Sequence, residues 1–193
     1  MHPSRQEIVV LTGHTDWVRD VAFSPDSSML VSASRDHSII LWDLQSHEAK
    51  TVIPAHRGSV ESVAFSPDGK LLAAAGYHHP DFDFVGFLSL RDMKSGKAVF
   101  EQEVAGRATA IAFSHNGKTF AVAAGLGSRG PFRGKKPVIS LWDTASRKQV
   151  ATLEGHEGAV RWMTFSPDGK TLTSVGERMA IRRWNVEQGK LLS

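Results

Sequence analysis

Apolar and polar residues alternate in short runs along the chain, and turn residues separate the runs. Val21 and Phe23 stand two positions apart, as do Val63 and Phe65, which is the period of a half-buried β-strand. These runs and their two counterparts end in the sequences FSPDS, FSPDG, FSHNG and FSPDG. Pro fixes φ at the first corner, Asp or Asn caps the turn, and Gly accepts a positive φ, so these sequences predict hairpin turns. Ser27 replaces Gly in the first copy, where we expect slight strain.

The turn sequence marks an internal repeat. It begins at Phe23, Phe65, Phe113 and Phe165, in steps of 42, 48 and 52 residues, and a second marker, LWD, LRD, LWD or RWN, runs through Trp42, Arg91, Trp142 and Trp184. Both series share a shortest step of 42 residues, so the longer steps contain local insertions. The runs MLVSAS, SIILWD and KTVIP, with their counterparts, predict three further strands per copy. Each copy is therefore expected to form a four-stranded antiparallel sheet.

The order of these motifs, GH, then FSPDG, then SAS-x-D, then LWD, resembles the WD-repeat family, in its bacterial-type form, over nearly the whole chain. The resemblance implies an all-β fold, a WD-repeat β-propeller segment of four blades, each a four-stranded antiparallel sheet. We expect repeats at about 13–53, 54–102, 103–153 and 154–193, preceded by a spare N-terminal strand at 7–12. Since GKLLS at the C-terminus ends partway through a fourth strand, the fourth blade should have three strands.

Four blades are too few to close a ring of the WD type. Propellers use about 4 to 8 blades, and WD propellers typically have about seven, so four blades span little more than half a circle. We therefore expect an open arc, which is either part of a longer propeller or one half of an eight-bladed ring formed by a homodimer. Because an isolated arc would expose the edges of its terminal blades, we expect a dimer or larger species in solution.

The WD resemblance also implies a buried, hydrogen-bonded tetrad in each blade. An indole N–H buried in a blade needs an acceptor, and a Ser–His–Asp chain satisfies each polar group in turn. In the first copy the tetrad falls on His14, Ser32, Asp36 and Trp42. The fourth copy keeps His156, Ser174 and Trp184 but has Arg178 in the Asp position. The second copy keeps only His56 and the third only Trp142, so blades one and four should be the most rigid.

WD proteins usually bind partners on the propeller face that carries the GH loops. The resemblance implies contacts three and five residues after the His and one before the tetrad Asp. These positions are Trp17, Arg19, Arg35, Ser59, Glu61, Ala159, Arg161 and Glu177, with Arg107 and Thr109 assigned by counting back from Phe113. Two insertions lie between the second and third strands of their copies and should emerge on the same face. The basic insertion adds the candidates Arg129, Phe132, Arg133, Lys135 and Lys136.

Three sequence features invite an enzymatic or ligand-binding interpretation, and each has a simpler one. The His, Ser and Asp of the tetrad are not accompanied by a G-x-S-x-G motif. The segment GLGSRG at 125–130 has the glycine spacing of a dinucleotide loop, but Pro131, Gly134 and Pro137 exclude the helix that a pyrophosphate requires. The segment YHHPDFDF offers metal-ligand types, His78, His79, Asp81 and Asp83, without a spacing that fixes them. We therefore expect no catalytic residue, no metal site and no cofactor.

Composition narrows the remaining functions. The chain has no cysteine, which excludes disulfides and thiolate chemistry and fits a cytoplasmic protein. No apolar run suffices for a signal peptide or a membrane span, and a net charge of +3 supports nucleic-acid binding only weakly. We expect a non-catalytic scaffold that binds a peptide or protein of acidic or phosphorylated character, because guanidinium groups suit carboxylate and phosphate. The alternative is nucleic-acid binding through residues 129–136 and the same arginines, with a steep dependence on salt.

Overall fold

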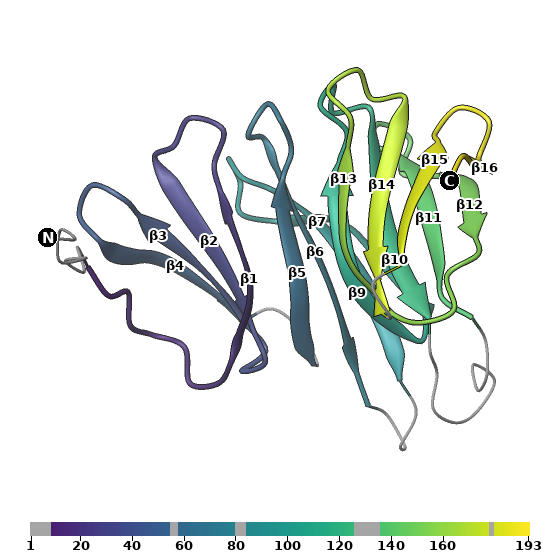
Figure 1. Ribbon diagram of the computed structural model, residues 1–193. Coiled ribbons are helices and arrows are strands. Elements are labelled where there is room, and N and C mark those ends of the chain that lie inside the picture. The colour runs from purple at the N-terminus through teal and green to yellow at the C-terminus, as the bar shows by residue number, and fades with distance from the viewer. Residues whose placement is uncertain (1–8, 55–57, 80–83, 126–135, 178–179) are drawn as a thin grey trace, which may run out of the picture.

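The computed structural model describes residues 9–54, 58–79, 84–125, 136–177 and 180–193. Within these ranges the regular structure consists of four antiparallel sheets, each with four strands in chain order (Figure 1). Blade 1 contains β1 (Val18–Phe23), β2 (Met29–Ser34), β3 (Ser38–Asp43) and β4 (Glu48–Pro54). Blade 2 contains β5 (Ser59–Phe65), β6 (Leu71–His78), β7 (Val85–Asp92) and β8 (Ala98–Ala105). Blade 3 contains β9 (Arg107–Phe113), β10 (Thr119–Gly125), β11 (Val138–Asp143) and β12 (Gln149–Glu154). Blade 4 contains β13 (Val160–Phe165), β14 (Thr171–Gly176), β15 (Ile181–Asn185) and β16 (Lys190–Leu191).

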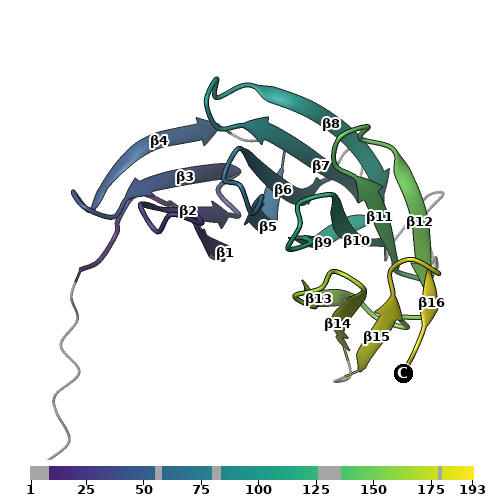
Figure 2. The ribbon, with the colours of Figure 1, turned by 90° about the horizontal axis from the view of Figure 1, so that it is seen from above.

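The four blades stand side by side in an open arc. Seen from above, the first strand of each blade, β1, β5, β9 and β13, lies on the concave side, and the last strand lies on the convex side (Figure 2). Blades 1 and 4 form the two ends of the arc and do not meet (Figure 2). This arrangement confirms the expected all-β propeller segment with four antiparallel blades. No helix in the described ranges has the length and apolar character needed to cross a membrane.

The two chain ends differ from the sequence expectation. Blade 4 has a fourth strand, β16, in which Leu191 pairs with Trp184 and Lys190 with Asn185, so the expectation of three strands was wrong. The backbone of Arg183 continues this pairing by accepting from the N–H of Leu192. The spare strand expected at 7–12 is not formed in its described part, residues 9–12. In a closed propeller such a strand would complete the last blade, but blade 4 lies at the other end of the arc (Figure 2).

Blades 2 and 3 each pack one face on the preceding blade and the opposite face on the following blade, and blades 1 and 4 at the ends of the arc each have one neighbour. We name the first of these faces the incoming face and the second the outgoing face. The incoming face of blade 2 carries Val63 and Phe65, which pack on Val31 and Leu41 of the outgoing face of blade 1. Equivalent apolar clusters join blade 2 to blade 3 and blade 3 to blade 4. The outgoing faces of blades 1 to 3 are rich in alanine, which lets neighbouring sheets approach closely.

A chain of hydrogen bonds joins the first three blades. Asp20 Oδ2 in β1 accepts from Ser62 Oγ at 2.8 Å and from the Val63 N–H at 3.0 Å, both in β5. Ser62 Oγ in turn accepts from the Ile111 N–H in β9 at 3.2 Å. The register places Ala110 at the corresponding position of blade 3. Because an alanine side chain cannot accept a hydrogen bond, this chain stops before blade 4.

The hairpin turns have the local chemistry that the sequence predicts. Asp26 Oδ1 accepts from Ser24 Oγ at 2.6 Å and from the Ser28 N–H at 3.0 Å. These bonds, led by that from Ser24, lower the pKa of Asp26 to about 2. Ser27 has a φ of 58°, close to the 69° of Gly69 in the same turn of blade 2. A non-glycine residue in this region costs about 1 kcal/mol, which confirms the strain expected for the first turn.

Candidate functional site

Blade 1 contains a continuous hydrogen-bonded chain of four side chains. Trp42 Nε1 donates to Ser32 Oγ at 2.8 Å, and Ser32 Oγ lies 2.7 Å from His14 Nε2. His14 Nδ1 lies 2.8 Å from Asp36 Oδ2. Because Ser32 accepts from Trp42, its own proton is available to His14 Nε2, which leaves Nδ1 to donate to the carboxylate. The chain therefore attaches the loop before β1 to the body of the blade.

The carboxylate of Asp36 is held in its ionised form. Burial alone would raise its pKa, but hydrogen bonds from Ser38 Oγ, the Thr15 N–H and His14 outweigh burial and keep the pKa well below its ordinary value. The distances to Ser38 Oγ and to the Thr15 nitrogen are 2.6 and 3.0 Å. The His–Ser–Asp set is thus engaged in fixing loop structure, which is the role that we propose for it instead of catalysis.

Blade 4 contains three members of the same chain. Trp184 Nε1 donates to Ser174 Oγ at 2.8 Å, and Ser174 Oγ lies 2.7 Å from His156 Nε2. Burial lowers the pKa of His156, and the charge of Arg182 lowers it further, so the imidazole is neutral near pH 7. Gly176 leaves room for the ring, because a Cβ there would lie 2.6 Å from His156 Nδ1. Arg178, at the Asp position, lies outside the described residues.

The hydrogen-bonded tetrad is incomplete in the two middle blades. In blade 3, Val122 occupies the Ser position, and the buried Trp142 Nε1 has no hydrogen-bond partner within the described ranges. In blade 2 the Ser and Trp positions hold Ala74 and Arg91. His56 lies outside the described residues. A buried donor without a partner costs about 1–3 kcal/mol, so blade 3 contains a local defect.

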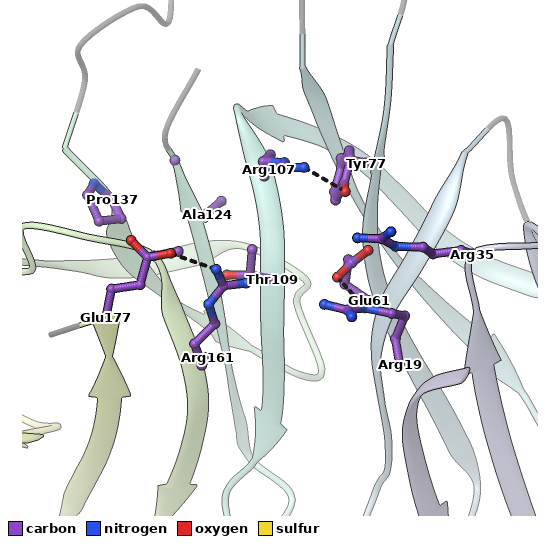
Figure 3. A pocket seen from close by; sticks show the side chains of 12 residues that line it. Arg19, Arg35, Glu61, Tyr77, Arg107, Thr109, Ala124, Pro137, Arg161 and Glu177 are labelled. Atoms are coloured by element: carbon purple, nitrogen blue, oxygen red, sulfur yellow. Dashed lines mark hydrogen bonds and ion pairs between the residues drawn. The ribbon is translucent and has the colours of Figure 1, made fainter. Parts of the chain in front are cut away.

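The beginnings of the inner strands line a cavity of about 220 Å³ (Figure 3). It lies at the upper ends of these strands in Figure 3, which are their lower ends in Figure 1, and we name it the upper cavity. Four arginines and two glutamates supply its charged groups. Its lining is Arg19, Arg35, Glu61, Tyr77, Arg107, Thr109, Ala124, Gly125, Pro137, Ala159, Arg161 and Glu177. Most of the contact positions expected from the sequence are therefore brought together in one place, from all four blades.

Two of the arginines are in ion pairs. Arg19 Nε lies 3.0 Å from Glu61 Oε2, and the glutamate side chain is only 5% exposed. Ser59 Oγ donates to the other carboxylate oxygen of Glu61 at 2.6 Å. Arg161 Nη2 lies 2.6 Å from Glu177 Oε1, with both side chains about half exposed. The second pair is solvated and contributes little to stability, so a ligand can displace it at small cost.

The other two arginines have aromatic neighbours and no carboxylate partner among the described residues. The guanidinium of Arg107 lies 4.4 Å from the ring centroid of Tyr77 and 4.2 Å from that of Phe84. Arg107 Nη2 also donates to Tyr77 Oη at 2.8 Å (Figure 3). Arg35 lies 5.0 Å from the ring of Trp17. The Nε atoms of Arg35 and Arg107 are buried without a hydrogen-bond partner in the described ranges.

The balance of charge favours an anion. Four guanidinium groups face two carboxylates in the upper cavity, which leaves an excess of two positive charges. An adjoining hollow of about 480 Å³ shares Arg35, Tyr77 and Arg107 with the upper cavity and adds three histidines and one carboxylate: His37, His78, His79 and Asp16. Burial lowers the pKa of His79, as do the charges of Arg107 and His78, so this imidazole offers a neutral donor or acceptor.

The remaining expected contact residues divide into three groups. Thr109 Oγ1 donates to the Val160 carbonyl at 2.6 Å and Ala159 is buried, so both shape the wall of the cavity. Lys136 is paired with Glu157 at 2.7 Å on the exposed surface, and Trp17 is 67% exposed. The others lie outside the described residues: Arg129, Phe132, Arg133 and Lys135. So do Asp81 and Asp83, and the described residues contain no group of three or more side chains placed to hold a metal ion.

Sequence reasoning missed Tyr77 and Phe84, which position Arg107. Tyr77 is the chain's single tyrosine and ends a run of small apolar residues, which is an unusual place for a large polar ring. This unusual position was the signal by which sequence analysis could have found Tyr77. Phe84 is the last residue of the insertion YHHPDFDF in the second copy, and no sequence pattern relates it to an arginine 23 positions later.

The four-stranded blades and the hydrogen-bonded tetrad define a segment of a β-propeller built from repeats. The sequence profile of the family "WD domain, G-beta repeat" matches residues 5–43, 47–79 and 147–185, more than half of the chain. The protein therefore belongs to the WD-repeat family. The segment between residues 79 and 147, which contains both the second insertion and the eroded third copy, is not matched.

Several proteins are similar over nearly the whole chain. Nuclear distribution protein PAC1-1 of Uncinocarpus reesii is 31% identical over 186 residues, which are 95% of this chain and 33% of that protein. Nuclear distribution protein nudF of Aspergillus niger is 30% identical over 182 residues, 94% of this chain and 32% of that protein. Cilia- and flagella-associated protein 57 of Mus musculus is 28% identical over 95% of this chain and 13% of its own length. The chain thus spans about a third of the fungal relatives, and these eukaryotic proteins give no support to the bacterial-type qualifier.

Proposed function

We propose that this chain is a non-catalytic scaffold that binds a peptide or protein at the upper cavity through an acidic or phosphorylated side chain. The observation that carries the proposal is the excess of two guanidinium charges in one cavity, on Arg35 and Arg107. Their aromatic neighbours hold both groups in place before a ligand arrives, which reduces the entropy lost on binding. A planar guanidinium with free N–H groups is suited to two hydrogen bonds with a carboxylate or phosphate.

The size of the cavity supports a side chain as the ligand. Pockets for small molecules have volumes of about 300–1,000 Å³. The upper cavity, at about 220 Å³, is smaller and matches one charged head group. The rest of a peptide would lie along the edge of the arc where the inner strands begin, where Trp17 is exposed and the Arg161–Glu177 pair is solvated.

The relatives support a scaffold role only by analogy. The printed names of the fungal proteins refer to the distribution of nuclei, and that of the mouse protein refers to cilia and flagella. These are cellular roles, and the shared segment is a third or less of those proteins. We extend to this chain only protein binding in the cytoplasm, because function follows from the site and not from the fold.

The test uses fluorescein-labelled peptides of one sequence whose central residue is phosphoserine, Glu or Gln, measured by fluorescence anisotropy. We expect the phosphoserine and Glu peptides to bind more tightly than the Gln peptide. The double substitution Arg35→Gln and Arg107→Gln should reduce the affinity for the phosphoserine peptide at least tenfold. The matched control, Lys94→Gln with Lys97→Gln, removes two positive charges from an exposed turn of blade 2 and should change affinity less than twofold.

Equal binding of the three peptides, or an equal loss in both double variants, would contradict the proposal. A single-stranded oligonucleotide is tested in parallel between 50 and 200 mM salt. If it binds more tightly than every peptide, and its affinity falls steeply with salt, the alternative of nucleic-acid binding is correct.

A further inference from the structure

The incoming face of blade 1 is open, whereas the same face of every other blade is covered. Val21 and Phe23 are 52% and 64% exposed. At the equivalent register positions, Val63 and Phe65 of blade 2 are 4% and 9% exposed, and their counterparts in blade 4, Met163 and Phe165, are 5% and 2% exposed. Val18 is likewise 50% exposed, while Val60 and Val160 at the equivalent position are fully buried.

This open face keeps the residue types of a covered one. Its outer row is Phe23, Leu30 and Trp42, and the matching row of blade 4 is Phe165, Leu172 and Trp184. In blade 4 that row packs on blade 3. Phe23, like Val18 and Val21, is exposed in a pattern that elsewhere in the molecule meets a neighbouring sheet, whereas Trp42 is only 3% exposed. The exposed part of the face is therefore built for contact with a blade.

The outgoing face of blade 4 does not match the outgoing faces of the other blades. Arg183 occupies the position of Leu41, Leu90 and Leu141, which are at most 4% exposed. Trp162, which is 54% exposed, occupies the position of Asp20, Ser62 and Ala110. A blade packed against this face would have to bury a guanidinium group and accommodate an indole where the other interfaces hold a small or short polar side chain.

Hydrogen bonding supports the same distinction for blades 1 and 2, while blade 3 packs on blade 4 with Ala110, which is no acceptor, at this position. The outgoing faces of blades 1 and 2 provide an acceptor, Asp20 or Ser62, for a backbone N–H of the next blade. The corresponding N–H of blade 1 is that of Val21, which donates to its own neighbour, Asp20 Oδ1, at 2.9 Å. An indole can donate a hydrogen bond but cannot accept one, so Trp162 cannot serve Val21 in this way.

We propose that the incoming face of blade 1 is a docking surface for a further WD blade with the outgoing-face pattern of blades 1 and 2, and that blade 4 of a second copy is not that blade. The docked blade carries Asp or Ser at the Asp20 position and Leu at the Leu41 position. The arc is therefore extended at the blade 1 end by a different blade, and two copies do not close a ring head to tail. This inference is independent of the ligand proposed for the upper cavity.

The test restores the regular pattern on blade 4 of the full chain with Trp162→Ser and Arg183→Leu. The repaired outgoing face should then dock on blade 1 of a second copy. We expect its dimer dissociation constant, measured by sedimentation equilibrium against the 21.1 kDa monomer, to be at least tenfold lower than that of the unmodified chain. Adding Phe23→Lys to the repaired variant should abolish the gain. Lys148→Leu, which adds an apolar side chain at an exposed position outside both faces, should give no gain.

Circular dichroism and the melting temperature establish that each variant is folded. A folded repaired variant without the gain would overturn the proposal, as would a gain that survives Phe23→Lys. One further result would contradict the proposal: a dimer of the unmodified chain that is disrupted by Phe23→Lys and weakened by Trp162→Ser with Arg183→Leu. In that case blade 4 of a second copy would be the natural occupant of the face.

Discussion

We predict that replacing tryptophan by phenylalanine at the tetrad position destabilises a blade whose indole N–H is hydrogen-bonded more than a blade whose indole N–H is unpaired. Trp42 and Trp142 occupy the same position in blades 1 and 3 and are 3% and 7% exposed. Trp42 Nε1 donates to Ser32 Oγ, whereas Trp142 Nε1 has no hydrogen-bond partner in the described part of the chain. Phenylalanine removes the N–H in both cases and leaves a void of similar size.

The two substitutions should differ by about 2–4 kcal/mol in the free energy of unfolding. The smaller ring costs about 1–2 kcal/mol at either position, from lost burial and the void. Trp42→Phe also loses a hydrogen bond worth about 1 kcal/mol. Trp142→Phe instead removes an unpaired buried donor, which returns about 1–3 kcal/mol. We therefore expect a clear destabilisation at Trp42 and a nearly neutral change at Trp142.

The assay is urea unfolding followed by far-ultraviolet circular dichroism, with the two variants compared at equal m-values. Trp184→Phe is the internal control, because Trp184 donates to Ser174 as Trp42 does to Ser32. It should behave like Trp42→Phe. If all three substitutions cost the same, the unsatisfied state of Trp142 has no energetic consequence and the reasoning fails.

Two further outcomes are expected. Val122→Thr places a hydroxyl beside Trp142 Nε1 and should change the free energy of unfolding by less than about 0.5 kcal/mol, whereas Val31→Thr, equally buried, should cost about 2 kcal/mol in the same urea assay. Because burial and then Arg182 lower the pKa of His156 below its ordinary 6.5, protonation favours the unfolded chain. The neutral His156 contributes fully to the stability of the folded chain above about pH 6.5, and this contribution is lost as the pH falls towards the folded-state pKa. His156→Gln should therefore make the melting temperature depend less on pH between pH 7 and 5.

The blades could be predicted from sequence because their signals are local. The alternation ending at Phe23 and the turn chemistry around Asp26 each act within a few residues. Two pairings in β16 and the absence of a strand at 9–12 depend instead on where sheet edges lie in space. No local pattern contains that information.

The sequence predicted which residues lie near one another at the candidate site, but not how their side chains contact each other. Counting from the motifs placed Arg19, Arg107 and Arg161 near one another, because repeats put equivalent residues at equivalent places. The stacking of Arg107 on Tyr77 and Phe84 joins blades 2 and 3 and requires the register between sheets. The distinction between the two faces of blade 4 has the same origin, since a shift of one residue would exchange Trp162 with Met163.

The hydrogen bonds from Asp20 through Ser62 to Ile111 also determine how the arc opens. The amide protons of Val63 and Ile111 are held by side chains of the preceding blade, so they exchange with solvent only when blades separate. Blade 4 is joined to blade 3 by the bond from Thr109 Oγ1 to the Val160 carbonyl, which holds no amide proton of blade 4. Blades 1 to 3 should consequently exchange as one cooperative unit, and blade 4 should open before it. Since the upper cavity has walls on both sides of that boundary, a ligand that bridges them would slow amide exchange in blade 4, far beyond the residues that it touches.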